Sequence, residues 1–241
     1  MNETAEKIKR LYGLKVAALL KGDIEAINKM LTIAAVDQFA RDSGRLLAEQ
    51  IIDVLEWEKY PEALLFESTA RDIIFPLLQV QHENLTPYFE KAQDAVNKRN
   101  DWPIKSKMSE FSKSRANGLV ETMINKSYES LVSSFPATSE QFSAGMIDDS
   151  VKSNADYIYK VGYPVKVTRT AETKACEWCK NLEGSYQYND LSNADDIWKR
   201  HEGCVCDIQI TKGGGGKESL QNFRPRVSRN RERSIRIANR G

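Results

Sequence analysis

The feature that most constrains this chain is the gathering of its cysteines near the C-terminus. All four cysteines and one of the two histidines lie within the 31 residues from Cys176 to Cys206. They form a Cys176-x-x-Cys179 pair, followed by His201, Cys204 and Cys206. Four cysteines scattered at random over 241 positions would almost never fall so close together. One small substructure therefore needs them together, as a metal site, a disulfide pair or a redox pair.

Zinc is the metal that this pattern favours. A tetrahedral zinc site takes four sulfur or imidazole ligands, commonly a close pair from one turn and a second pair from elsewhere. Cys176 and Cys179 have the spacing of a first pair, and His201, Cys204 and Cys206 offer three candidates for the other two positions. The four cysteines are the preferred ligand set, with His201 as the competing fourth ligand. On an extended strand Cys204 and Cys206 would point the same way, about 6–7 Å apart, so both could face the first pair. The alternatives are reduced cysteines that pack a small β-core, disulfides, and thiol exchange.

The remaining composition is that of an ordinary globular protein, with 41% hydrophobic and 29% charged residues and a mean hydropathy of −0.53. No apolar run approaches the ~20 residues that a membrane span needs, so no membrane partner is expected. The N-terminus has no apolar segment behind a basic start, so no signal peptide is visible. We therefore expect synthesis in a reducing cytoplasm, where clustered cysteines favour metal binding over structural disulfides.

Charge is distributed unevenly along the chain. Residues 211–241 hold nine basic and two acidic side chains, a net +7, which leaves −6 for residues 1–210 because the whole chain carries +1. An acidic body and a basic tail suggest that the two parts meet different partners. The tail arginines could contact DNA phosphates or an acidic protein surface, or they could simply be solvated. These arginines are Arg224, Arg226, Arg229, Arg231, Arg233 and Arg236.

The order of sequence patterns predicts an α+β protein. Residues 3 to about 160 carry apolar side chains at three- and four-residue steps, which is typical of helices. We expect one long helix over residues 109–132 and another over 139–161. The segment 133–138 should separate them, because Pro136 stands there among serines.

The pattern changes after Gly162-Tyr163-Pro164. Alternation of apolar and polar residues predicts strands at Val165–Thr170, Ser185–Tyr188 and Cys204–Ile210, with a short helix or loop at 192–200. Gly213 to Gly216 form a linker that should be flexible. The expected architecture is a long, mainly α-helical region at 1–161, a small Cys-rich β-containing module at 162–211, and a linker with a flexible basic tail at 212–241.

The order of motifs in this module resembles the C-terminal module of the phage Mu F-like head-morphogenesis family, the minor head proteins of tailed bacteriophages. The resemblance rests on a strand followed by Cys176-Glu-Trp-Cys179, Leu182-Glu-Gly184 and His201-Glu-Gly-Cys204-Val-Cys206. The family pattern is Cys-x-x-Cys, a Leu-x-Gly turn and His-Pro-x-Cys-Arg-Cys. This chain departs from it where Glu202 replaces the proline and Val205 the arginine. The match covers about 50 of the 241 residues.

The resemblance implies a virion component present in few copies, and not an enzyme. Such a protein would lie in the head interior or at the portal vertex and contact the portal protein or the major capsid protein, with packaged DNA as a further candidate partner. It would act in head assembly and in DNA packaging or delivery. The first alternative is a zinc-stabilised nucleic-acid-binding protein, or a nuclease.

A weaker alternative is an ADP-ribosyltransferase-like effector, because a distant relation to these enzymes has been proposed for the family. Arg169-Thr170 stands on a predicted strand, but no downstream Glu-x-Glu or Ser-Thr-Ser strand follows. We therefore interpret Arg169 as a surface arginine. The acidic pair Asp148-Asp149 is interpreted as capping or solvated. Trp178 and Trp198 are expected to cover the small core of the cysteine cluster.

Overall fold

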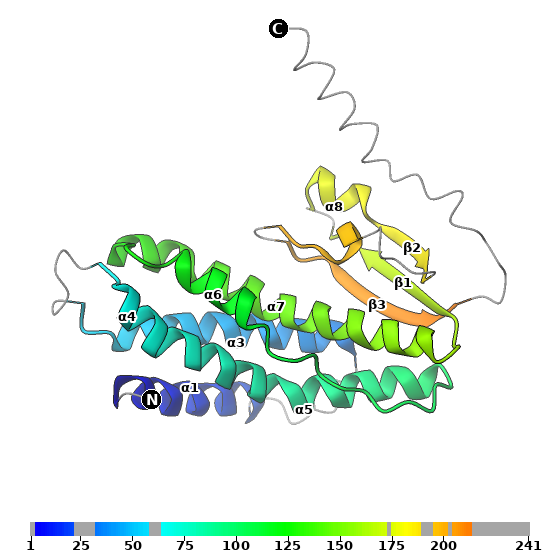
Figure 1. The fold of residues 1–241 in the computed structure, drawn as a ribbon, viewed down its shortest axis with the longest axis horizontal. Helices are drawn as coiled ribbons and strands as arrows, with labels where there is room; N and C mark the ends of the chain where they lie inside the picture. Colours follow the sequence, from blue (N-terminus) through cyan, green and yellow to red (C-terminus); the bar gives the residue numbers. More distant parts are fainter. Residues whose placement is uncertain are drawn as a thin grey trace, which may run out of the picture.

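The computed structural model describes residues 3–21, 32–57, 64–172, 175–188, 195–201 and 204–213. A layer of long helices carries a small three-stranded sheet on one side (Figure 1). This confirms the α+β prediction of a mainly helical region followed by a small Cys-rich β-containing region. The predicted glycine linker beyond Gly213 and the arginine tail lie outside the described residues.

Four long helices form the main layer, and shorter elements connect them. The long helices are α1 (Glu3–Lys21), α3 (Ile33–Val54), α5 (Phe75–Arg99) and α7 (Tyr128–Lys160). The shorter ones are α4 (Glu67–Thr69), the π-helical turn η3 (Ala70–Ile74), α6 (Lys113–Glu121), α8 (Glu177–Asn181) and the 3-10 turn η5 (Asp195–Trp198). None of the helices among the described residues is long and apolar enough to span a lipid bilayer.

Helices α3 and α7 lie against each other at close range. The Thr32 side chain caps α3 by accepting a hydrogen bond of 3.2 Å from the Ala35 N–H. Farther along α3, Gly44 has no side chain, and this lets the α7 backbone approach. A Cβ at Gly44 would lie 2.3 Å from Ser143 Oγ and 2.7 Å from the Ser139 carbonyl oxygen. Because the two helices are this close, the Ser139 hydroxyl donates a hydrogen bond of 2.8 Å to the Gly44 carbonyl.

The helix boundaries differ from the sequence expectation in one region. Helix α7 runs unbroken through residues 133–138, so the predicted separation there is wrong. Pro136 removes one backbone hydrogen bond, but Leu131 and Phe135 are both buried, and their packing keeps the helix continuous. The real interruption lies at residues 122–127, where Asn125 adopts a left-handed φ of 61°.

The sheet has the strand order β2-β1-β3, and both pairs are antiparallel. Its strands are β1 (Val165–Thr170), β2 (Gly184–Gln187) and β3 (Asp207–Lys212). The first two agree with the predicted ranges, but the third begins at Asp207 and leaves Cys204 and Cys206 outside the strand. Val167 pairs with Tyr186 on one side and Ile210 on the other.

One face of the sheet packs on the helices. Val165, Val167, Ile208 and Ile210 are buried in the same hydrophobic core as the helical side chains. In Figure 1 the sheet lies over α7, with β3 also contacting α3. A second, smaller cluster of buried residues forms at the far end of the sheet, around the cysteines.

Candidate metal centre

The local fold at α8 brings the first two cysteines together. Cys176 is the N-cap of α8, and its Sγ accepts a hydrogen bond of 3.5 Å from the Cys179 N–H. This places both sulfurs on one turn, with Cys176 exposed and Cys179 buried. The backbone N–H of Cys179 lowers the pKa of the Cys176 thiol below its ordinary value. Cys176 is therefore poised to act as a thiolate ligand.

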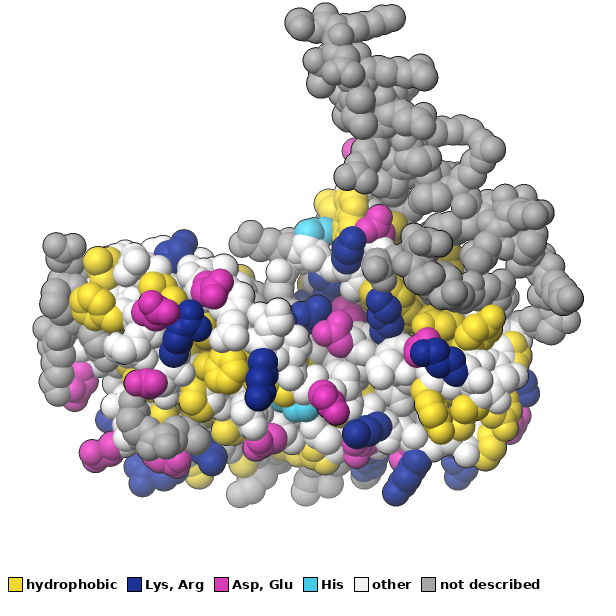
Figure 2. Space-filling model, in the orientation of Figure 1, with side chains coloured by type: hydrophobic (Ala, Val, Ile, Leu, Met, Phe, Trp, Pro, Cys, Tyr) yellow, Lys and Arg dark blue, Asp and Glu magenta, His cyan; other side chains and the backbone are white. Residues whose placement is uncertain are grey.

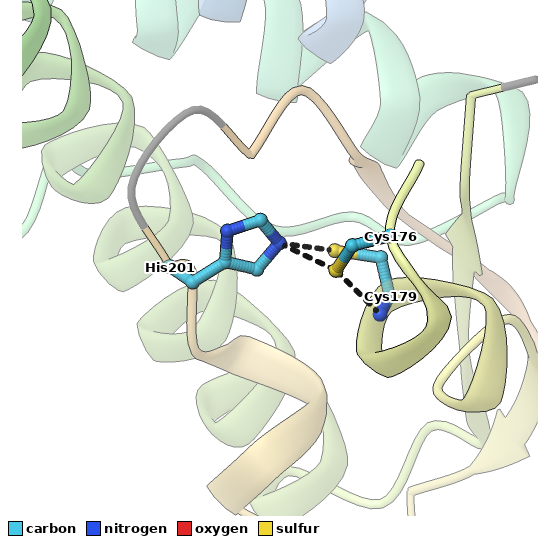
Figure 3. Close-up of side chains that lie close together, drawn as sticks. All are labelled: Cys176, Cys179 and His201. Atoms are coloured by element: carbon cyan, nitrogen blue, oxygen red, sulfur yellow. Dashed lines mark hydrogen bonds between the residues drawn. The ribbon is translucent and has the colours of Figure 1, made fainter. Parts of the chain in front are cut away.

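His201 reaches this pair from the segment that follows η5. Figure 3 shows its ring pointing toward both sulfurs, with Nε2 3.1 Å from Cys176 Sγ and 2.9 Å from Cys179 Sγ. The ligand atoms of these three residues all lie within 4.8 Å of one another. They form the first candidate metal-binding group.

Cys204 and Cys206 complete a second group, again with Cys179. The three sulfurs lie within 4.8 Å of one another, and Cys179 Sγ is 3.6 Å from Cys204 Sγ. The expected separation of about 6–7 Å on an extended strand is therefore wrong. Both cysteines precede β3, so the spacing of an extended strand does not apply to them, and the Cys204 N–H donates to the His201 carbonyl at 3.0 Å.

All five side chains singled out from the sequence thus converge, as two triads that share Cys179 and could hold a metal ion. The four cysteines are free thiols. Cys179, Cys204 and Cys206 are buried, with Ala171, Ala175 and Trp178 packed around them. Burial raises the pKa of the Cys179 thiol. A cluster of buried sulfur donors beside one imidazole is the donor set that soft and borderline metal ions prefer.

The prediction that Arg169 lies at the surface is wrong. Its side chain is 0% exposed and is the largest of the fully buried side chains. Arg169 lies on β1 two residues after Val167, and the alternation of a strand turns both to the core face. Its guanidinium reaches the cysteine cluster, where Nη2 lies 3.6 Å from Cys204 Sγ and 3.9 Å from Cys179 Sγ.

Asp148 was interpreted as capping or solvated, and it is in fact buried in an ion-pair network. Arg200 donates to both carboxylate oxygens of Asp148, and its Nη2 also donates to Asp37 at 3.2 Å. Arg41 donates to Asp37 from the other side at 2.8 Å. Burial lowers the pKa of Arg200, but the charges of Asp148 and Asp37 outweigh it and leave that pKa above its ordinary value.

This network joins the cysteine-containing region to the helices. Arg200 precedes the candidate ligand His201, and its Nη1 donates to the Cys206 carbonyl at 2.7 Å. Asp37 and Asp148 belong to α3 and α7. Arg200 belongs to no sequence motif, and its place directly before the candidate ligand His201 was the one available signal of its role.

Asp149 and the two tryptophans near the cysteines have structural roles. Asp149 pairs with Arg115 at 3.0 Å, in a partly exposed ion pair. Of the two tryptophans, Trp178 packs on the cysteine cluster as expected, but Trp198 lies in the main hydrophobic core. The arrangement at Asp148-Asp149 therefore differs from a metal-nuclease site, because arginines occupy both carboxylates.

No protein-family model, curated protein or solved structure matches this chain. The resemblance to phage head-morphogenesis proteins rests on the motif residues alone.

Proposed function

We propose that this chain is a minor structural protein of a tailed-phage head, and that one zinc ion holds its C-terminal module together. The observation that carries the proposal is the convergence of Cys176, Cys179 and His201, with Cys204 Sγ 3.6 Å from Cys179 Sγ. These residues are the ones on which the family resemblance rests. The proposed role is assembly, with no catalytic step.

Zinc suits the donor atoms of the site. Sulfur and imidazole donors without a carboxylate are typical of structural zinc sites, which are closed and four-coordinate. With Zn–S bonds of about 2.3 Å, two sulfurs of a tetrahedron lie about 3.8 Å apart. The separation of 3.6 Å between Cys179 and Cys204 is close to that edge. We assign Cys176, Cys179, His201 and Cys204 as the four ligands. Cys206 is then a neighbouring thiol that does not bind the metal.

The position of the site explains what a zinc ion would do here. Cys176 and Cys179 belong to the connection between β1 and β2, while His201 and Cys204 belong to the segment that leads into β3. A metal bound by all four would tie these two connections together at the outer end of a small sheet. A sheet of three short strands has little core of its own, so such a tie would add rigidity.

The alternative readings have less support among the described residues. A nuclease needs free carboxylates, and Asp148 and Asp149 are held by Arg200 and Arg115. A transferase would need Arg169 open to substrate, and it is fully buried. On the face seen in Figure 2, basic and acidic side chains are mixed over the helical layer, whereas a DNA-binding face is rich in one sign of charge.

The head-protein proposal is tested by peptide mass spectrometry of purified proheads and full virions from the source phage. We expect the chain in both kinds of particle, at far fewer copies than the major capsid protein. Its absence from both would contradict the proposal. Tight, salt-dependent DNA binding by the purified chain would then favour the nucleic-acid-binding alternative.

A further inference from the structure

Arg169 stands out because its charge is buried and faces sulfur atoms. Its Nη1 donates to the carbonyls of Ile197 at 2.6 Å and Lys199 at 2.8 Å. Its Nη2 donates to the sulfurs of Cys204 and Cys179. The guanidinium carbon lies 5.3 Å from the centre of the Trp178 ring. The backbone and the aromatic ring hold the guanidinium in place, and its open side is aimed at two candidate metal ligands.

The carboxylates nearest to this region are already matched by other arginines. Asp37 forms ion pairs with Arg41 and Arg200, and Asp148 forms one with Arg200. Within the described part of the chain, no ion pair joins Arg169 to a carboxylate. A buried guanidinium stays protonated and is unfavourable without a negative partner. The sulfurs of Cys179 and Cys204 are the groups that its Nη2 reaches, and as thiolates they would supply negative charge.

A metal site of the proposed composition would carry the complementary charge. Three thiolates and one neutral imidazole around a divalent ion give a net charge of −1, which one guanidinium offsets. N–H groups that donate to metal-bound sulfur also fix the sulfur's orientation, and removing such a partner typically weakens metal binding about 10–100-fold. Arg169 Nη2 donates to two of these sulfurs, those of Cys179 and Cys204.

We infer that Arg169 is a positioning residue of the metal centre, which orients the Cys179 and Cys204 thiolates and offsets the net negative charge of the metal–thiolate group. This rests on the proposed metal centre and adds to it. It predicts a site that selects a divalent ion with three thiolates, since one guanidinium offsets the net charge of −1 of that combination.

The test uses Co²⁺ as a spectroscopic substitute for Zn²⁺ in the full-length chain. The thiolate-to-cobalt charge-transfer band reports the sulfurs directly, and competition with a chelator gives the affinity. We expect R169Q to bind Co²⁺ about 10–100-fold more weakly than the unaltered chain. Its band should move to lower energy, because the sulfur lone pairs lose a neighbouring positive charge. R169K keeps the charge but lacks the planar fork, and should recover part of the affinity.

The matched control is R41Q, which removes another buried arginine, one that donates to Asp37 and has no hydrogen bond to a cysteine among the described residues. It should lower the stability of the fold and leave the band of the bound cobalt unmoved. Unchanged affinity and an unmoved band in R169Q would overturn the inference. If R169Q does not fold, R169K decides, and an affinity and band equal to those of the unaltered chain would overturn it. Failure of the unaltered chain itself to bind Co²⁺ or Zn²⁺ would instead refute the metal centre.

Discussion

At the scale of single residues, the five candidate ligands are not equivalent. Cys179 belongs to both triads, is buried, and lies 2.9 Å from His201 Nε2 and 3.6 Å from Cys204 Sγ. Cys206 belongs to one triad and is the cysteine that the proposed ligand set leaves over. The two are both buried thiols, so they lose similar packing when replaced.

Substituting Cys179 and Cys206 one at a time distinguishes a metal ligand from a cysteine that only lies near the metal. We expect C179S to lose the bound zinc, because both candidate groups lose a ligand at once. C206S should retain zinc close to the level of the unaltered chain. Zinc content of the purified proteins, measured by elemental mass spectrometry under reducing conditions, checks this. Equal retention by the two variants would show that Cys179 is not a ligand.

At the scale of elements, the contact between α3 and α7 depends on Gly44. We expect G44A to destabilise the fold by about 1–3 kcal/mol, because the added Cβ overlaps Ser143 Oγ and the Ser139 carbonyl. Gly13 in α1 is the control, since a Cβ there meets nothing within 4 Å. G13A should stabilise its helix by roughly 0.5–1 kcal/mol. Urea unfolding of both variants measures the difference, and a neutral G44A would contradict the close approach.

The attachment of the cysteine-containing region to the helices depends on Arg200. In R200Q the carboxylate of Asp148 would stay buried without its cation, and this should cost about 3–5 kcal/mol in the free energy of unfolding. R71Q removes a partly exposed partner of Glu67 and serves as a control with little expected effect. Chemical denaturation checks both. If R200Q unfolds at the same denaturant concentration as R71Q, the network does not hold the two parts together.

At the scale of the whole molecule, one hydrophobic core spans the helices and the sheet, and the ion-pair network crosses between them. Metal binding should therefore stabilise the whole fold, since an ion that binds only the folded chain raises its stability. We expect a chelator to lower the melting temperature of the whole protein. Far-UV circular dichroism follows the helices during melting, and an unchanged helical transition in chelator would show that the metal region is energetically separate.

Much of this architecture follows from sequence patterns, and the errors have identifiable causes. Two-residue alternation predicted β1 and β2, and cysteine spacing predicted the cluster. The same alternation puts Arg169 on the core face with Val165 and Val167, but the preference of arginine for the surface was given more weight. The continuity of α7 through Pro136 comes from packing on both sides of the proline, which local propensity does not contain. The strand prediction began at Cys204, but β3 begins at Asp207, and the alternation of the sequence does not mark where the strand starts.

The most direct test of the account is native mass spectrometry of the full-length chain, purified under reducing conditions and supplied with zinc. The account predicts a mass increase of one zinc ion per chain, lost in C179S and kept in G13A. A folded chain that shows no added metal mass in the presence of excess zinc would contradict it, and the cysteines would then be reduced thiols that pack a small core.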